Sequence, residues 1–109
     1  MSEPTAASDG QERRQPDVTR VLEICNKRGL HARASAKFVM TVEQYDAEVW
    51  VTRGNERVGG TSIMGLMMLA AGPGSTLHIT AEGPEGPEAL EALVTLVETG
   101  FDEELAEED

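Results

Sequence analysis

The sequence predicts an α+β domain in which helices cover one face of an antiparallel sheet. The hydrophobic period alternates along the chain between two, typical of a half-buried strand, and 3.6, typical of an amphipathic helix. The resulting order of elements is βαββαβα. The second and third strands are joined by the two-residue turn Gly54-Asn55, which indicates an antiparallel hairpin. The chain has 109 residues, enough for a single domain with a modest core.

The first strand is predicted at residues 21–25, where Leu22 and Ile24 have the spacing of a buried face. The turn that follows ends at Gly29, which can adopt the positive φ of a tight reversal. A helix is predicted from Ala32 onward. Its buried stripe consists of Ser35, Phe38, Val39 and Val42.

The hairpin comes next. Its first strand spans residues 48–53, with Val49 and Val51 facing the core and Trp50 on the opposite face. After the turn, residues 56–58 return as a short strand. A lone tryptophan could serve a binding site, but a partly covered sheet residue is the commoner case.

A short helix is predicted over residues 63–69, with Thr61 or Ser62 as its cap. Leu66 and Leu69 share a face and are expected to be buried. The rest of the helix is also apolar, which is unusual for a small surface helix. The residues expected to form an exposed docking patch are Ile63, Met64 and Met67. An ordinary core helix is the alternative.

The last strand and helix complete the pattern. Residues 76–82 alternate, so that Leu77, Ile79 and Ala81 point inward and His78 points outward. The last helix opens at Gly86-Pro87 and ends at Gly100, and Phe101 anchors the end. Its buried stripe consists of Leu90, Leu93, Val94 and Val97.

His31 is the candidate reactive residue, because it falls at the N-cap of the first helix. A helix N-terminus favours anions, phosphate above all. No acid occurs in the sequence between Glu23 and Glu43. The bases clustered around His31 are Lys27, Arg28, Arg33 and Lys37. These charges favour a neutral, nucleophilic imidazole and would stabilise a phosphoryl group attached to it. A local cap or a plain surface histidine is the alternative.

The net charge of −11 comes from the second half of the chain. Residues 58–109 hold eleven acids and no base, whereas residues 1–57 hold nine of each. A protein with this negative charge is not expected to bind nucleic acid or an anionic membrane surface through its overall field. We expect no membrane insertion and a cytoplasmic location, because no secretory signal or membrane-spanning apolar run is present.

The sequence divides the chain into three regions. Residues 1–17 are polar and predict a disordered N-terminal extension, followed by the folded domain at 18–101 and an acidic tail at 102–109. Cys25 cannot form an internal disulfide and is expected to be a buried apolar filler. Two distant histidines and one cysteine predict no metal site.

The motif Gly29-Leu30-His31-Ala32-Arg33 resembles the active-site motif of HPr, the histidine phosphocarrier family of the bacterial phosphoenolpyruvate phosphotransferase system. The resemblance covers residues 20–101. Residues 62–66 resemble the regulatory-serine segment of HPr proteins, and residues 100–104 are similar to the ending of NPr, the carrier of the nitrogen-related branch. The resemblance implies an HPr-like open-faced β-sandwich, with a four-stranded antiparallel sheet of order 1-4-2-3 and three helices on one face.

The function that the resemblance implies is that of a stoichiometric phosphocarrier and not of an enzyme. Enzyme I would donate a phosphoryl group to Nδ1 of His31, and His31 would pass it to an enzyme II A-type acceptor protein. Arg33 would clamp the phosphoryl group, and the backbone N–H groups of Ala32 and Arg33 would bind its oxygens. No cofactor is implied, and a monomer is expected. The ending favours the regulatory nitrogen branch over sugar uptake.

Ser62 is implied as a regulatory phosphorylation site for HPr kinase/phosphorylase, with a plain helix cap as the alternative. A phosphate there would bring about two negative charges beside the docking patch. A function of another class is also open: a signalling module that binds target proteins according to its phosphorylation state. A ferredoxin-like metal chaperone fails for lack of a paired cysteine motif.

Overall fold

The computed structural model describes residues 18–103. The predicted extension at 1–17 and the tail residues 104–109 lie outside the described residues. The elements are β1 (Val18–Glu23), α2 (Ala32–Val42), β2 (Glu48–Arg53), β3 (Glu56–Gly59), α3 (Ile63–Met68), β4 (Thr76–Glu82), α4 (Gly86–Glu98) and the single 3-10 turn η1 (Gly100–Asp102). The predicted order βαββαβα is confirmed.

The four strands form one antiparallel sheet in the order β1-β4-β2-β3, as the resemblance implied. The first strand begins earlier than predicted, because Val18 already pairs with Ala81. It also ends earlier, at Glu23. Beyond that end, the N–H of Ile24 still donates to the carbonyl of Ser75 at 2.9 Å, which keeps the side chain of Ile24 directed into the core.

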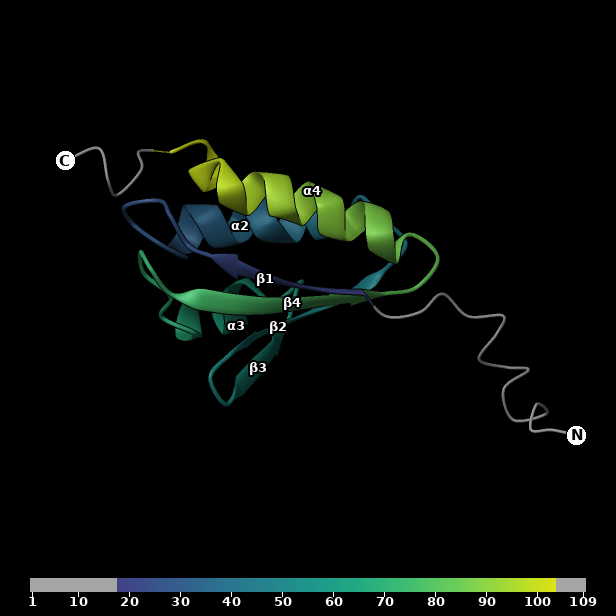
Figure 1. Ribbon diagram of the computed structural model, residues 1–109, viewed down its shortest axis with the longest axis horizontal. Helices are drawn as coiled ribbons and strands as arrows, with labels where there is room; N and C mark the ends of the chain where they lie inside the picture. The colour runs from purple at the N-terminus through teal and green to yellow at the C-terminus, as the bar shows by residue number, and fades with distance from the viewer. Residues whose placement is uncertain (1–17, 104–109) are drawn as a thin grey trace, which may run out of the picture.

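The helices cover one face of this sheet. Helices α2 and α4 lie side by side, and α4 packs on β1 and β4 (Figure 1). Helix α3 packs against β3 and α2. The approach of α3 to β3 is close, since a Cβ atom placed on Gly65 would lie 3.0 Å from Cβ of Val58. The short helix is therefore held beside α2, the helix that His31 begins.

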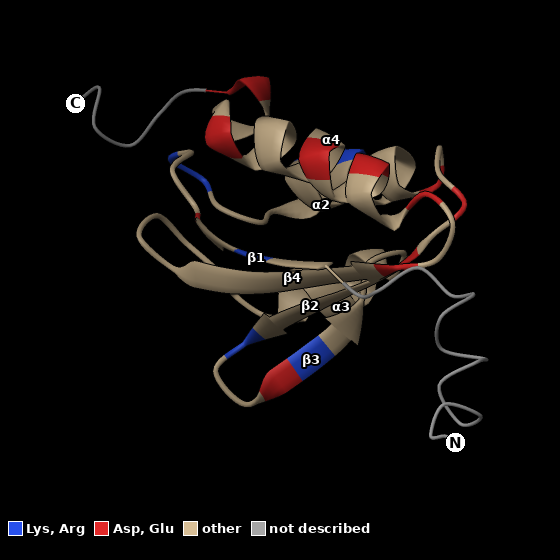
Figure 2. Ribbon diagram, turned by 45° about the vertical axis from the view of Figure 1, so that its right-hand side comes forward, with Lys and Arg blue, Asp and Glu red and all other residues tan. Residues whose placement is uncertain are grey.

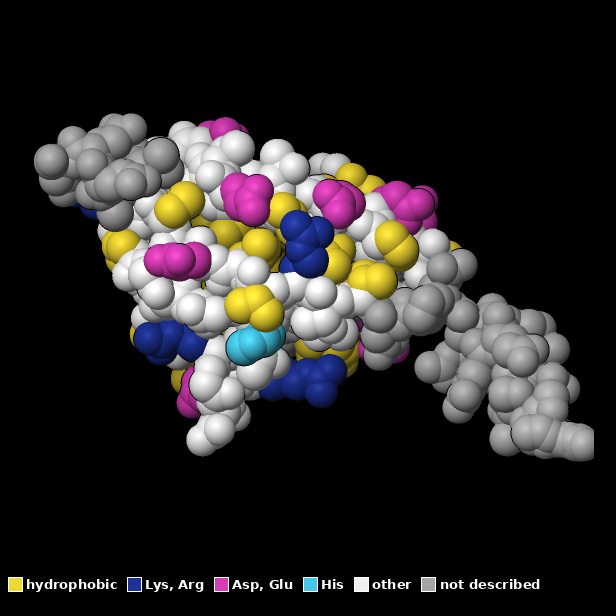
Figure 3. All heavy atoms as spheres, in the orientation of Figure 1, with side chains coloured by type: hydrophobic (Ala, Val, Ile, Leu, Met, Phe, Trp, Pro, Cys, Tyr) yellow, Lys and Arg dark blue, Asp and Glu magenta, His cyan; other side chains and the backbone are white. Residues whose placement is uncertain are grey.

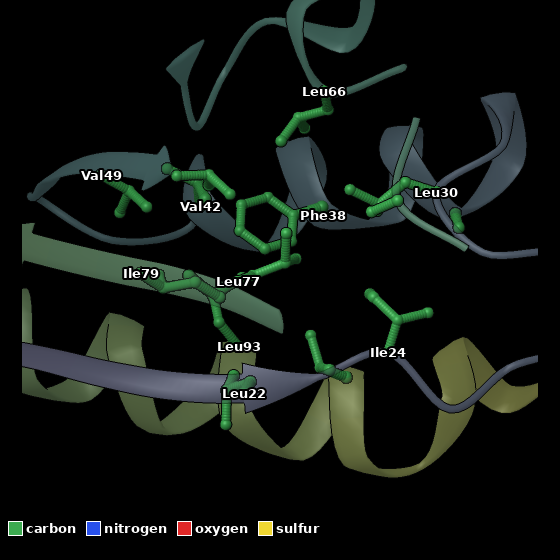
Figure 4. Packing of buried hydrophobic residues seen from close by; sticks show 14 of the residues in the cluster. Leu22, Ile24, Leu30, Phe38, Val42, Val49, Leu66, Leu77, Ile79 and Leu93 are labelled. Atoms are coloured by element: carbon green, nitrogen blue, oxygen red, sulfur yellow. The ribbon is translucent and has the colours of Figure 1, made fainter. Parts of the chain in front are cut away.

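The core lies between the sheet and the helices, and Phe38 of α2 is fully buried at its centre (Figure 4). Leu77 and Ile79 face it from β4, and Leu66 faces it from α3. The predicted inward faces of both long helices and of the strands are confirmed. The buried members of the predicted stripes are Ser35, Phe38, Val39, Val42, Val49, Val51, Leu66, Leu69, Leu77, Ile79, Ala81, Leu90, Leu93, Val94 and Val97.

The prediction for Cys25 is wrong in part. Its side chain is only partly buried, because it lies in the loop after β1 at the rim of the core. The thiol donates to the carbonyl oxygen of Val97 at 3.4 Å, at the end of α4. Cys25 is thus a polar contact at the helix end and not an apolar filler.

Charge is unevenly distributed over the fold. Acidic residues lie along α4 and at its two ends, whereas basic residues lie in the loop between β1 and α2 and on the β2–β3 hairpin (Figure 2). On the side that carries α4 and β1, acidic side chains alternate with hydrophobic ones along the helix (Figure 3). No helix in the described part of the chain is long and apolar enough to span a membrane.

Candidate functional site around His31

His31 is the N-cap of α2, as predicted. Its backbone is extended, with φ −75° and ψ −177°, and its carbonyl accepts the N–H of Ser35 at 2.8 Å. The turn before it depends on Gly29, which has φ +65°. A Cβ atom on Gly29 would lie 2.2 Å from the carbonyl oxygen of Ala71, so no larger residue fits there without a shift of the backbone.

Both ring nitrogens of His31 have hydrogen-bond partners. The backbone N–H of Arg33 donates to Nδ1 at 3.3 Å. On the other side of the ring, Nε2 lies 2.8 Å and 3.0 Å from the two carboxylate oxygens of Glu103. The side chains of His31 and Glu103 are each only 17% exposed. The ring is therefore held between the start of α2 and the chain that follows α4.

Glu103 is itself held in place. The Nδ2 group of Asn26, which is fully buried, donates to Oε1 of Glu103 at 3.1 Å and to the carbonyl of Gly29 at 2.9 Å. Partial burial alone would raise the pKa of Glu103. The hydrogen bonds from His31 and Asn26, with the charges of His31 and Lys37, outweigh burial and leave the pKa below its ordinary value. Glu103 is thus a carboxylate at neutral pH.

A pocket of about 230 Å³ opens at the same place. Its lining consists of Lys27, Arg28, Arg33 and Glu103. Three of the four predicted cationic residues therefore converge on one pocket, and its fourth lining residue is Glu103, the carboxylate that binds His31. The fourth, Lys37, instead donates from Nζ to the carbonyl oxygen of Phe101 at 2.7 Å.

The acid-free surroundings predicted for His31 are wrong. Sequence reasoning counted only neighbours along the chain, and Glu103 arrives from 72 positions away. The sequence pattern places Glu103 in the acidic tail that starts at 102, whereas the structure brings it to the ring of His31. The sequence did contain a signal for this contact, namely Gly100 as the helix end followed by Phe101 as an anchor. A segment that is anchored directly after a helix keeps the next residue close to the fold. Phe101 is fully buried, as predicted.

The other candidate residues lie on α3. Ser62 is exposed and caps the helix, and its Oγ accepts the N–H of Gly65 at 2.9 Å. The residues of the docking patch are exposed as expected, Ile63 by 40%, Met64 by 69% and Met67 by 39%. Sequence reasoning missed Met68, which is 73% exposed and extends the patch. His78 points outward from β4.

Among residues 18–103, no group of three or more histidine, cysteine, aspartate or glutamate side chains is arranged to hold a metal ion. The chemistry available at the site is that of a neutral or charged imidazole, a carboxylate and a cationic pocket.

The sequence and the fold were compared with known proteins. Residues 18–99 match the family model described as "PTS HPr component phosphorylation site". The phosphocarrier protein HPr of Neisseria meningitidis is 51% identical over 82 residues, which cover 75% of this chain and 92% of the relative. The phosphocarrier protein NPr of Shewanella violacea is 39% identical over 86 residues, covering 79% of this chain and 94% of the relative.

A solved structure of an HPr protein has the same fold. The HPr structure from Thermoanaerobacter tengcongensis superposes with a TM-score of 0.75 at 44% identity, covering 84% of this chain and all of that one. The motif at His31, the sheet order and these relatives lead to one conclusion. The chain belongs to the HPr family of phosphocarrier proteins of the phosphotransferase system.

Proposed function

We propose that the chain relays a phosphoryl group through His31, from phosphorylated Enzyme I to an enzyme II A-type acceptor protein. The observation that carries this proposal is the hydrogen bonding of the ring. Because a backbone N–H can only donate, the bond from Arg33 requires an unprotonated Nδ1, which is the nucleophilic form. That atom faces the start of a helix beside a cationic pocket, where a phosphoryl group is favoured.

The transfer needs little chemistry beyond positioning and charge stabilisation. The lone pair of Nδ1 attacks phosphorus, the bond to the donor breaks, and its electron pair stays with the donor. The guanidinium of Arg33 clamps the phosphoryl oxygens, and the N–H groups of Ala32 and Arg33 bind them. The reverse sequence passes the group to the acceptor. The chain turns over no small substrate, so it acts as a stoichiometric carrier.

Docking falls to the exposed apolar patch Ile63, Met64, Met67 and Met68 on α3. Methionine side chains adapt to several partners in turn, which suits a carrier that meets a donor and then an acceptor. The proposal includes a monomer that diffuses in the cytoplasm between these two proteins. It also includes Ser62 as a phosphorylation site for HPr kinase/phosphorylase, because the hydroxyl is exposed beside the patch.

The choice of acceptor is part of the proposal. The ending at residues 100–104 favours the regulatory nitrogen branch. Overall identity favours an HPr of the general type, since the Neisseria relative is 51% identical and the NPr relative 39%. Phosphorylated protein incubated with both kinds of acceptor decides between them by the rate at which each takes the label.

The test of the relay is transfer of labelled phosphate from phosphoenolpyruvate by Enzyme I. His31→Ala is expected to abolish acid-labile labelling while the fold is kept, since an N-cap loss costs about 1 kcal/mol. His78→Ala, which removes the only other histidine, is the matched control and is expected to be labelled normally. Labelling of His31→Ala would refute the relay. Labelling of His31 without onward transfer to any acceptor would favour the signalling module instead.

A further inference from the structure

We propose that Glu103 is a positioning residue for His31, which fixes the ring and its Nε2 proton so that Nδ1 presents the free lone pair. The inference rests on the proposed relay function and assigns a role to a residue beyond the matched family region, which ends at 99. Glu103 contacts the ring but not the reacting nitrogen, so it acts through His31.

The hydrogen bonds on the two sides of the ring assign the same tautomer independently. The N–H of Arg33 is a donor, so Nδ1 is the acceptor at 3.3 Å. The carboxylate of Glu103 is an acceptor, so Nε2 carries the proton at 2.8 Å. The lowered pKa of Glu103 keeps the carboxyl ionised at neutral pH. The two contacts are mutually consistent only if the proton is on Nε2.

The segment that brings Glu103 to the ring is strained. Gly100, Phe101 and Asp102 have consecutive φ values of +66°, +56° and +61°, and the last two are not glycine. Aspartate adopts the left-handed conformation more readily than most residues, but at a bulky residue such as Phe101 it persists only where the surroundings enforce it. Here the buried ring of Phe101, the bond from Lys37 to its carbonyl and the bond from Asn26 to Glu103 do so.

The position of Glu103 suits the transfer. When Nδ1 forms its bond to phosphorus, the proton on Nε2 stays on the ring, which then carries a positive charge. The carboxylate of Glu103 faces that proton and stabilises the charge, as orienting carboxylates do for other histidines. Because Nδ1 and Nε2 lie on opposite sides of the imidazole, Glu103 does not occupy the place of the phosphoryl group. Arg28 and Arg33 line the pocket together with Lys27 and Glu103, and their guanidinium groups can bind the phosphoryl oxygens.

The first test measures the ring itself in the full-length, unphosphorylated protein, so it does not depend on the relay. Long-range ¹⁵N–¹H spectra of His31 are compared for the unsubstituted protein, Glu103→Gln and the exposed control Glu98→Gln. The unsubstituted protein and the control are expected to show one tautomer with the proton on Nε2. Glu103→Gln is expected to show a mixture, because an amide can also donate to Nε2. Identical spectra in all three proteins would overturn the proposal.

The second test measures the rate at which Enzyme I labels the same three proteins. Glu103→Gln is expected to accept phosphate roughly ten- to a hundredfold more slowly, as for loss of one charge-assisted hydrogen bond. Glu98→Gln is expected to match the unsubstituted protein. Equal rates for Glu103→Gln and Glu98→Gln would refute the role of Glu103. If the unsubstituted protein itself accepts no phosphate, the relay fails, and the spectra still decide the tautomer.

Discussion

Asn26 and Glu103 lie 77 positions apart in the chain, and the Nδ2 group of Asn26 donates to Oε1 of Glu103 at 3.1 Å. The same group donates to the carbonyl of Gly29. Asn26 therefore links the two chain segments that flank His31, the turn before α2 and the segment after α4. Because Asn26 is fully buried and Glu103 is mostly buried, this link is largely shielded from water.

Replacement Asn26→Asp keeps the shape of the side chain but removes both donors and places a second carboxyl beside Glu103. We expect a loss of at least about 2 kcal/mol in the free energy of unfolding at neutral pH. The matched control is Asn55→Asp in the exposed turn between β2 and β3, for which a change within about 0.5 kcal/mol is expected. Urea unfolding of both variants checks this. Equal losses would mean that the link to Glu103 contributes nothing.

The contact between Glu103 and His31 predicts a pH dependence of stability. A carboxyl whose pKa is lowered by folding stabilises the folded state above its unfolded pKa and loses that contribution as the pH falls through its folded pKa. The pKa of Glu103 lies below its ordinary value of 4.5. The free energy of unfolding should therefore exceed that of Glu103→Gln at and above neutral pH, and the difference should shrink below pH 4.5. A difference that grows on acidification would contradict the prediction.

Gly29 is predicted to tolerate no side chain. Gly29→Ala combines a positive φ with a clash against the carbonyl of Ala71, and we expect a loss above about 2 kcal/mol. Gly54→Ala isolates the conformational part, because Gly54 has φ +60° but no atom within 4 Å of the added Cβ. Its expected cost is about 1 kcal/mol. Thermal unfolding of both variants measures the difference between their losses of stability. Equal losses would show that the backbone at Ala71 shifts to make room for the added methyl group.

Arg33 is expected to matter for rate and not for stability, since its side chain is exposed and lines the pocket. Arg33→Glu reverses the charge and should slow labelling by Enzyme I strongly, whereas Arg33→Lys keeps the charge, loses the forked donor set and should be intermediate. Labelling rates and unfolding curves are measured on the same preparations. If both variants react as fast as the unsubstituted protein, Arg33 is only a solvated neighbour.

Phosphorylation of Ser62 is expected to weaken docking without changing the fold. The hydroxyl already accepts the N–H of Gly65, so a negative group at this helix start is tolerated. The same charge lies beside the apolar patch that begins at Ile63. Ser62→Asp should accept phosphate from Enzyme I more slowly than Ser62→Ala, with unchanged thermal stability. An aspartate variant as fast as the alanine variant would exclude this form of inhibition.

Local rules predicted most of the fold. The periodic positions of Phe38, Leu77 and Leu93 were enough to orient their elements, because each apolar face had one core to bury against. The strand order came from the family resemblance, since hydrophobic period does not specify which strands pair. The start of β1 was missed because Val18 is only partly buried and Thr19 and Arg20 are exposed in this edge strand, which leaves no alternation to detect.

The site was predicted in part. Motif and charge indicated His31, Arg33 and the cationic cluster, because these residues are neighbours in sequence. Glu103 and Asn26 were missed, since their contact depends on the path of the chain after α4. A run of acids at a chain end has the composition of a solvated tail, and only the turn at Gly100–Asp102 directs one of those acids inward.

Because the turn at η1 carries Phe101 and leads to Glu103, the residue at which this protein is shortened or fused to a tag matters. A chain cut after Thr99, where the family match ends, would keep every strand and every helix longer than one turn. It would lose the buried ring of Phe101 and the carboxylate on His31 together. A carrier domain trimmed at that boundary would keep the core residues around Phe38, but Nε2 of its His31 would lose the carboxylate of Glu103. A tag joined directly at Glu103 would disturb the same contact, so fusions belong at the other end of the chain or beyond residue 109.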